Sequence, residues 1–276
     1  MVCSVKNIPI FYEEYGEGKP VLCIHGYSVD HRLMTGCLEP VFSPLPGYRR
    51  IYPDLPGMGK TPSAPWIKNA DDMLKMLEGF IQAVIPDENF LLVGESYGGY
   101  LSLGLLREMQ SKIEGVMLIC PVIFPKGSDK DLPPRCVLWT SDDLSKMAAY
   151  PGVDGYLDMA VIATPENYQK YRRDVSPGIE AADSDFLSQY ACEGYGFTFE
   201  NDIRNLAYDK PTSILAGRQD HVVGYSQALE ILTRFPRATY AVLDCAGHSL
   251  QIENEPLFTQ HMKDWLWRVD LAQRSI

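Results

Sequence analysis

The chain contains 276 residues, of which 46% are hydrophobic, so it can bury one large core or a core with an inserted subdomain. Its net charge of -11 disfavours nucleic acid and anionic membrane surfaces as partners, because every non-specific contact would begin with repulsion. We therefore expect a small-molecule substrate and neither a nucleic-acid partner nor a membrane partner.

The N-terminal segment alternates like a strand and lacks the basic segment and apolar stretch of a signal peptide. The seven cysteines are odd in number, and Cys23, Cys120 and Cys245 are expected in buried strands, where a thiol packs as a small hydrophobic group. This pattern is typical of a reducing compartment and predicts a cytoplasmic protein. The sequence has neither a CxxC pair nor an HExxH motif, and its five histidines lack zinc-site spacing, so no metal or other cofactor is expected.

Strand-like and helix-like segments alternate regularly in the first part of the chain. The expected elements are a hairpin at 2–5 and 9–15, a strand at 21–24, a helix at 29–38, a strand at 50–54, a helix at 70–84, a strand at 89–93, a helix at 97–109 and a strand at 115–120. Because apolar strands separated by helices form βαβ units, this order predicts an α/β fold with a mostly parallel sheet covered on both faces.

The pattern changes between residues 122 and 206, where Pro-rich and acidic turns separate helical pieces and no buried strand is expected. The helical pieces are expected at 142–149, 165–173 and 182–190. The alternation then resumes with a strand at 211–216, a helix at 226–234, a strand at 238–243 and a final helix at 256–269. We therefore expect a core made of residues 1–121 and 207–276, with a helical insertion at 122–206.

The strongest motif is Gly94-Glu95-Ser96-Tyr97-Gly98, which matches G-x-S-x-G between an apolar strand and a helix. In such an elbow the turn is so tight that the serine adopts a strained backbone, and the glycines remove side chains that would collide. The hydroxyl of Ser96 is then expected to stand exposed at the carboxyl end of the sheet, where a helix N-terminus favours developing negative charge. This context predicts that Ser96 is a nucleophile.

A serine hydroxyl is a weak nucleophile unless a base removes its proton. His248 is the best candidate for this base, because it lies in a short loop between the last apolar strand and the final helix. The other histidines are expected to be structural or on the surface: His31 and His261 lie on expected helices, and His221 lies on the preceding loop.

A base histidine also needs an acid that fixes its tautomer and stabilises its cationic form. Asp220 directly follows the penultimate strand and is therefore expected at the same edge of the sheet as Ser96. Its competitor is Asp129, which follows the strand after the elbow helix, whereas Asp244 is too close to His248 in the chain to turn back easily.

A tetrahedral intermediate needs amide donors directed at its charged oxygen. One donor is expected to be the backbone N–H of Tyr97, the residue after the nucleophile. The other is expected to be the backbone N–H of Tyr27, in the loop after the strand at 21–24. His25 in the same loop is expected to brace it through hydrogen bonds.

Together these motifs resemble the α/β-hydrolase superfamily, specifically its cap-bearing branch of esterases, C–C hydrolases, haloperoxidase-like enzymes and proline iminopeptidases. The resemblance spans nearly the whole chain and includes the His25-Gly26 loop, the 54–59 turn, the elbow, the 217–220 turn and the Gly247-His248 loop. It implies an eight-stranded sheet, a Ser-Asp-His order of triad residues and a helical cap at 122–206. The 54–59 turn looks like the family's structural D-x-x-G-x-G segment.

Departures from the pattern narrow the expected chemistry. A serine at the elbow differs from the aspartate of haloalkane dehalogenases and epoxide hydrolases, and the loop after His25 lacks the glycine-rich form found in proline iminopeptidases and many C–C hydrolases. The resemblance therefore favours hydrolysis of a small carboxylic ester through an acyl-enzyme. The alternatives are a C–C bond hydrolase, a proline-iminopeptidase-like amidase, an acyltransferase, or a non-catalytic ligand-binding protein on the same fold.

Aromatic residues are unusually dense in the segment expected to form the cap. We expect this segment to cover Ser96 as a lid, with some of its aromatic side chains packing it onto the sheet edge and others lining an apolar pocket. The aromatic residues are Trp139, Tyr150, Tyr156, Tyr168, Tyr171, Tyr190, Tyr195, Phe197 and Phe199.

Overall fold

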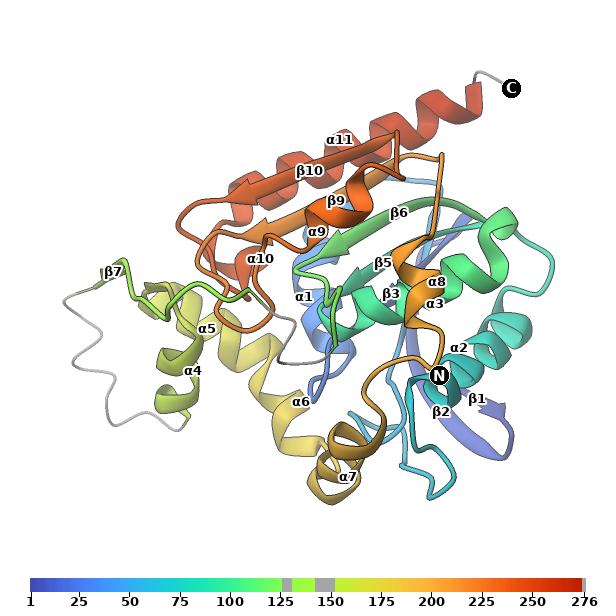
Figure 1. Ribbon diagram of the computed structural model, residues 1–276, viewed down its shortest axis with the longest axis horizontal. Coiled ribbons are helices and arrows are strands. Elements are labelled where there is room, and N and C mark those ends of the chain that lie inside the picture. Colours follow the sequence, from blue (N-terminus) through green and yellow to red (C-terminus); the bar gives the residue numbers. More distant parts are fainter. Residues whose placement is uncertain (126–130, 142–151, 275–276) are drawn as a thin grey trace.

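The computed structural model of the protein describes residues 1–125, 131–141 and 152–274. Within these ranges eight strands form one sheet, in the order β1-β2-β4-β3-β5-β6-β9-β10 (Figure 1). The strands are β1 (Val2–Val5), β2 (Ile8–Tyr15), β3 (Lys19–Ile24), β4 (Tyr48–Pro53), β5 (Phe90–Glu95), β6 (Ile113–Ile119), β9 (Thr212–Gly217) and β10 (Ala238–Leu243).

The sheet is mostly parallel. β1 pairs with β2 and β2 with β4 in antiparallel fashion, whereas every pairing from β4 through β3, β5, β6 and β9 to β10 is parallel. All residues of β5 and β9 are buried, as expected for central strands covered on both faces. The predicted mostly parallel eight-stranded sheet and its antiparallel edge hairpin are therefore confirmed, and the carboxyl ends of the parallel strands meet at one edge.

Helices cover both faces of this sheet (Figure 1). On one face α1 contacts α11, and on the other face α2 contacts α3. The buried indole of Trp265 attaches α11 to the sheet, because its Nε1 donates to the carbonyl of Pro211 over 3.1 Å just before β9. The helices that precede β6 or follow β9 in the chain are α1 (His31–Phe42), α2 (Ala70–Val84), α3 (Tyr97–Met109), the 3-10 helix η1 (Gln110–Lys112), α9 (Ala228–Leu232), α10 (Leu250–Glu253) and α11 (Glu255–Arg274).

Capping side chains define where several of these helices begin. Asp30 precedes α1 and accepts a hydrogen bond from the backbone N–H of Arg32 over 3.0 Å. Asn69 precedes α2 and accepts from the N–H of Asp72 over 3.0 Å. Each cap satisfies a backbone donor that has no partner inside its own helix, which explains why the chain turns helical at these points.

The described residues between β6 and β9, which we call the β6–β9 segment, are mainly helical. The segment contains β7 (Trp139–Thr140), α4 (Val153–Met159), β8 (Ile162–Ala163), α5 (Pro165–Asp174), α6 (Ser176–Ala181), α7 (Ser184–Gly194) and α8 (Glu200–Arg204). Helices were expected at the positions of α5 and α7, whereas the expected helix at 142–149 lies outside the described residues. Two short strands that were not expected also occur: β7 and β8 pair in parallel, β7 is exposed, and Ala163 in β8 is buried.

The cysteines also depart in part from expectation. Cys23 lies in the buried strand β3 as expected. Cys120 is buried but directly follows β6, and Cys245 is exposed and follows β10 instead of lying within it. Its φ of 57° belongs to a turn in the left-handed region, which ends the strand before this residue. No helix in the described ranges combines the length and the apolar character needed to cross a bilayer.

Candidate active site

Ser96 occupies a sharp turn between β5 and α3. Its φ of 52° and ψ of -114° are unusual for a residue with a side chain, so the backbone is strained here. The turn fits only because its neighbours lack side chains: a Cβ at Gly94 would lie 2.5 Å from the carbonyl oxygen of Gly98, and a Cβ at Gly98 would lie 2.2 Å from that of Ile24. The structure therefore has the elbow geometry expected from the motif.

Ser96 is held in place by the neighbouring strand. Its backbone N–H donates to the carbonyl of Ile119 over 2.8 Å, and its own carbonyl accepts from the N–H of Val122 over 3.0 Å. These bonds connect the end of β5 to the end of β6 on both sides of the strained residue. The hydroxyl is thereby presented at the carboxyl edge of the sheet and at the N-terminus of α3, where the helix dipole favours negative charge. The expectation that it would stand exposed was wrong, because Ser96 is buried with only 6% of its surface accessible.

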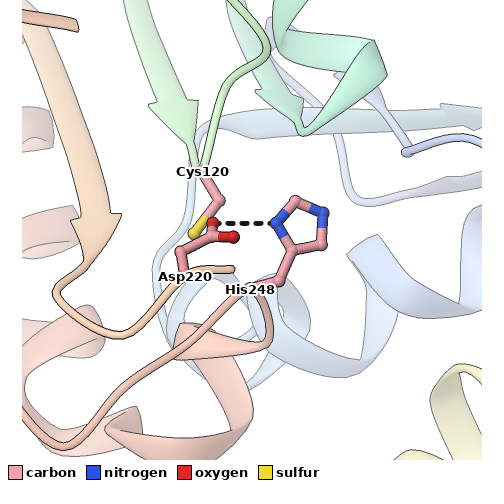
Figure 2. Close-up of side chains that lie close together, drawn as sticks. All are labelled: Cys120, Asp220 and His248. Atoms are coloured by element: carbon pink, nitrogen blue, oxygen red, sulfur yellow. Dashed lines mark hydrogen bonds and ion pairs between the residues drawn. The ribbon is translucent and has the colours of Figure 1, made fainter. Parts of the chain in front are cut away.

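The structure brings Ser96, His248 and Asp220 into one chain of hydrogen bonds. His248 Nδ1 donates to Asp220 Oδ2 over 2.9 Å, and the hydroxyl of Ser96 donates to His248 Nε2 over 2.9 Å. A carboxylate can only accept, so the contact with Asp220 keeps the proton on Nδ1 and makes Nε2 the acceptor. Figure 2 shows the imidazole of His248 directed at the Asp220 carboxylate.

Asp220 is fully buried, and its surroundings favour the ionised form. Burial by itself raises the pKa of this carboxyl, but the charge and hydrogen bond of His248 outweigh that effect and lower the pKa below its usual range. The backbone N–H groups of Val222 and Val223 act in the same direction, because both donate to Asp220 Oδ1, over 2.9 and 3.0 Å. Both carboxylate oxygens are thus engaged, which fixes the acid against the histidine.

The other candidate acids are arranged differently. Asp244 Oδ1 accepts a hydrogen bond from Gln219 Nε2 over 2.8 Å and is exposed. Asp129, the expected competitor of Asp220, lies outside the described residues. Of the acids that the structure describes near His248, Asp220 is the one bonded to Nδ1.

The loop after β3 lies directly against Ser96, where the second oxyanion donor was expected. A Cβ at Gly26 would be only 3.1 Å from Ser96 Cβ, so Tyr27 begins beside the nucleophile. Tyr97 begins α3, and its N–H is among the first four of the helix, which have no intrahelical partner. The backbones of Tyr27 and Tyr97 therefore flank Ser96 as expected.

The side chains of these two tyrosines have a role that the sequence did not indicate. The hydroxyl of Tyr27 donates to the carbonyl of Leu187, and the hydroxyl of Tyr97 is hydrogen-bonded to that of Tyr190. Both partners belong to α7. The two loops expected to hold the oxyanion are thus attached by their side chains to the β6–β9 segment.

His25 braces the loop as expected. Its Nδ1 donates to the carbonyl of Gly26 over 2.7 Å, and its Nε2 accepts from the N–H of Leu55 over 2.9 Å. This pattern needs the neutral ring, and burial correspondingly lowers the pKa of His25. His31, in contrast, pairs with Asp54 and begins α1, whereas His261 lies on α11.

Among the residues that the structure describes, two clusters of side chains have donor atoms close enough to hold a metal ion, but both already contain internal hydrogen bonds. Cys120, Asp220 and His248 form one cluster (Figure 2), and Asp30, His31 and Asp54 form the other. Burial raises the pKa of the Cys120 thiol well above its usual range, and the thiol donates to the carbonyl of Gly247 over 3.6 Å. A neutral thiol is a poor metal ligand, so the first cluster is better suited to hydrogen bonding.

A cavity of about 300 Å³ opens beside Ser96 and His248. Its wall is mostly apolar and aromatic, as is usual for small-molecule sites. The sheet edge contributes the loop after β3, the elbow and the loops after β9 and β10, and the β6–β9 segment contributes Met159, Tyr171, Val175, Ile179 and Tyr195.

Glu95 is a member of this cavity wall that the sequence analysis did not single out. Only 5% of its side chain is exposed, and its Oε1 lies 3.6 Å from His248 Nε2. Burial raises the pKa of this carboxyl to about 7, against the opposing effect of the charge on His248. The available signal was its position: a charged residue that continues an apolar strand into the elbow is buried with it, and buried carboxyls are rare unless they have a function or a partner.

Comparisons with known proteins agree with this geometry. The family described as alpha/beta hydrolase fold matches residues 19–255. The crystal structure of an alpha/beta superfamily hydrolase from Oenococcus oeni PSU-1 is 29% identical, has a TM-score of 0.90 and covers 98% of this chain and 99% of that chain.

Several curated relatives have named activities, and two of them illustrate the range. The 2-hydroxy-6-oxo-2,4-heptadienoate hydrolase of Pseudomonas putida is 24% identical over 92% of this chain and 91% of that protein. A pimeloyl-(acyl-carrier protein) methyl ester esterase of Legionella pneumophila is 31% identical over 38% of this chain and 39% of that protein. The relatives thus include both esterases and C–C hydrolases, and the chain belongs to the α/β-hydrolase family.

Proposed function

We propose that the protein is a serine hydrolase that cleaves a small carboxylic ester through an acyl-enzyme intermediate. The observation that carries this proposal is the hydrogen-bonded chain from Ser96 through His248 to Asp220, which ends at an apolar cavity. A hydroxyl next to a neutral histidine acceptor, with a buried carboxylate behind it, has the parts needed for nucleophilic catalysis.

In the proposed reaction the Ser96 hydroxyl attacks the ester carbonyl while its proton moves to His248 Nε2. The oxyanion that forms accepts hydrogen bonds from the backbone N–H groups of Tyr27 and Tyr97. Collapse of this intermediate breaks the bond to the alcohol, which leaves with the proton from His248. Water then attacks the acyl-enzyme by the same route, giving the carboxylic acid and regenerating Ser96. Asp220 stabilises the imidazolium of His248 during both acylation and deacylation.

The cavity favours an ester over the substrate of a C–C hydrolase. The relative from Pseudomonas putida is named for a heptadienoate, which carries a carboxylate. None of the described residues that line the cavity is a lysine or an arginine, so no permanent cation is available there to bind such a group. This supports a substrate without a carboxylate, such as a simple ester.

We infer further that the β6–β9 segment acts as a lid that sets which acyl or alcohol groups fit. Support comes from its contribution to the cavity wall, because Tyr171 and Tyr195 line the same cavity as Ser96 and His248. It supplies none of the three residues in the hydrogen-bonded chain. We therefore assign chemistry to the sheet edge and specificity to the segment, which corresponds to the cap expected at 122–206.

Labelling with a small fluorophosphonate tests the proposal. The wild-type protein should be labelled on the peptide that contains Ser96, and the Ser96→Ala variant should stay unlabelled. A panel of esters of graded acyl length, assayed with and without an added alcohol, then separates hydrolysis from acyl transfer. A protein that is neither labelled nor active on any ester would contradict the proposal, and products formed mainly by transfer to the alcohol would assign an acyltransferase instead.

A further inference from the structure

Glu95 places a carboxyl group inside the proposed active site that the Ser-His-Asp mechanism does not use. It directly precedes Ser96, lines the cavity and approaches His248 Nε2 to 3.6 Å with its Oε1. Its Oε2 lies against the loop after β3, because a Cβ at Gly26 would be only 2.2 Å from it. The absence of a side chain at Gly26 is therefore what makes room for this carboxyl beside the nucleophile.

The cavity wall offers few positive charges that could neutralise the Glu95 carboxylate. Among the described residues of the cavity wall, His248 is the one that can become cationic, and it already faces Asp220. A smaller neighbouring cavity is lined by Lys170 and Arg173, and both are paired: Lys170 with Glu255, and Arg173 with Asp174 over 2.6 Å. A negative charge on Glu95 is thus not neutralised by any of these cations and acts on whatever enters the cavity.

We propose that Glu95 is a specificity-determining residue whose carboxylate excludes acyl groups carrying a negative charge and admits neutral or cationic ones. The proposal rests on the proposed ester hydrolysis at Ser96 and defines the substrate class of that same site. In a cavity walled mainly by apolar side chains, like charges are poorly screened. Repulsion between the carboxylate and a substrate anion should therefore dominate the selection between otherwise equal esters.

The effect of Glu95 on the choice between charged and neutral substrates can be separated from its effect on the chemical step. For a neutral ester, the intermediate contains one oxyanion and one imidazolium, so Glu95 repels one and attracts the other and the two effects oppose each other. A substrate carboxylate adds a second negative charge that has no such compensation. The ratio of kcat/KM between an anionic and a neutral ester therefore reports on Glu95, while the effects common to both substrates cancel.

Titration of Glu95 should change this ratio with pH. Burial raises the pKa of Glu95 to about 7, opposed by the charge on His248 and by the N–H of Gly26, and supported by the charge of Asp220. The other titratable groups facing it are Tyr195 and the thiols of Cys37 and Cys120, and burial raises the pKa of all three well above neutrality. Glu95 is therefore mostly neutral at pH 6 and mostly ionised at pH 8.5.

The decisive experiment uses p-nitrophenyl esters with matched acyl groups: pentanoyl as the neutral form, glutaryl with a terminal carboxylate, and 4-(trimethylammonio)butanoyl with a cation. At pH 8 the wild-type kcat/KM should be lower for the glutaryl than for the pentanoyl ester. Glu95→Gln, which removes the charge and keeps the shape, should raise the glutaryl-to-pentanoyl ratio on the order of tenfold to a hundredfold, as expected for like charges a few ångströms apart in a partly screened site. The same variant should lower the preference for the cationic ester.

Asp244→Asn is the matched control. It removes one negative charge from the loop that carries His248, but Asp244 is exposed and lies outside the cavity wall. Its glutaryl-to-pentanoyl ratio should equal that of the wild type, because an exposed charge is screened by solvent and salt. An equal shift in both variants would indicate an effect of net charge and would overturn the assignment to Glu95.

A second measurement uses the wild-type protein and does not depend on how Glu95→Gln folds. The glutaryl-to-pentanoyl ratio should fall as the pH rises from 6 to 8.5, and this pH dependence should be absent in Glu95→Gln. A ratio that stays constant with pH in the wild type would overturn the proposal. If the pentanoyl ester is hydrolysed and Ser96 is labelled, such a result refutes only the role of Glu95. If neither occurs, the proposed ester hydrolysis itself fails, and this inference fails with it.

Discussion

The sheet edge and the β6–β9 segment both contribute to the cavity, but they are held in the molecule by different interactions. Backbone hydrogen bonds and strand register hold the sheet edge, as in the bond from Ser96 N–H to the carbonyl of Ile119. Side chains hold much of the segment, as in the hydrogen bond between Tyr97 and Tyr190 and the 2.8 Å bond from Phe197 N–H to the hydroxyl of Tyr100. A single backbone bond, such as that from Asp183 N–H to the carbonyl of Gly57 over 2.9 Å, adds to them without forming a ladder. Backbone ladders constrain geometry more strongly than single side-chain contacts, so the two regions suit different tasks.

This difference supports a division of labour between the two regions. Groups that must be aligned for proton transfer lie where the backbone fixes them, and groups that only need to fit a substrate lie on the segment. The tyrosines at 27 and 97 connect the two, because their backbones flank Ser96 and their side chains contact α7. Four substitutions test the comparison, and they are ordered below by the size of the effect expected.

The largest loss is expected from Ser96→Ala, which removes the nucleophile at the sheet edge. Ester turnover should fall on the order of a million-fold, because the histidine and acid cannot act without the hydroxyl. The strained turn should persist, since alanine leaves the backbone bonds of residue 96 in place. Burst and steady-state kinetics measure the loss, and circular dichroism with thermal unfolding checks the fold. Retention of more than a few per cent of turnover would mean that another residue is the nucleophile.

A smaller loss is expected from Asp220→Asn. The amide can no longer hold the proton on His248 Nδ1 as the carboxylate does, so turnover should fall on the order of ten-thousand-fold. Asp129→Asn serves as the matched control and should retain near wild-type kcat. The reverse result would move the orienting acid to Asp129.

A substitution in the β6–β9 segment should change the order of kcat/KM values among esters and leave the reactivity of Ser96 unchanged. Ile179 lines the cavity although the residue is 46% exposed, so truncating it costs little stability. Ile179→Ala should change kcat/KM for long acyl esters by a few-fold to about tenfold relative to short ones, which is the range set by a few methylene contacts. Fluorophosphonate labelling of Ser96 should stay unchanged.

Leu132→Ala is the control for this prediction. Leu132 belongs to the same segment and is 42% exposed, but it lies outside the cavity wall. Its substitution should leave the ranking of esters as in the wild type. If Ile179→Ala instead lowered all substrates and the labelling equally, the segment would contribute to stability or catalysis, and the division of labour would be wrong.

The same division explains which features could be predicted from the sequence. The bounds of α2, α3 and β10 were predicted to the residue, because their periodicity or continuous apolar character is set locally. Ser96 was predicted from the G-x-S-x-G motif in its strand-to-helix context. Asp220 and His248 were predicted because their loops follow strands of the sheet, and the carboxyl ends of parallel strands converge. The burial of Glu95 could have been inferred from its position, but its contact with His248 and the partners of the two tyrosine hydroxyls depend on long-range packing that has no sequence period.

In the β6–β9 segment, the short length of the elements also limited what could be predicted from the sequence. Helices α4, α6 and α8 are only 7, 6 and 5 residues long, too short for a hydrophobic period to be recognised. The pairing of β7 with β8 joins strands of two residues each, which no alternation pattern can reveal. Such elements are formed by tertiary contacts, for example those around the buried Tyr156, so they become visible only in the folded protein.

The smallest effect on catalysis is expected from Asp54→Asn, which tests the buried hydrogen bonds of Asp54 that hold the turn after β4. Asp54 is fully buried after β4 and accepts hydrogen bonds from His31 Nδ1 over 2.7 Å and from the N–H of Lys60 over 2.8 Å. The amide removes the charge that pairs with His31, so the free energy of unfolding should fall by about 2 to 4 kcal/mol. Turnover per labelled active site should change little, because neither residue contacts the cavity.

The pH dependence of this destabilisation identifies its cause. Burial opposes ionisation of both partners, but their mutual hydrogen bond and charge lower the pKa of Asp54 and raise the pKa of His31. The lowered pKa of Asp54 stabilises the fold above its ordinary value of about 4, and this contribution is lost as the pH falls through the folded pKa. The raised pKa of His31 stabilises the fold below its ordinary value of about 6.5, and this contribution is lost as the pH rises through the folded pKa. Urea denaturation of wild type and Asp54→Asn should therefore show a larger difference at pH 5.5 than at pH 8.5. A difference that is equal at the two pH values would mean that Asp54 stabilises the turn through hydrogen bonds to neutral donors, without an ion pair to His31.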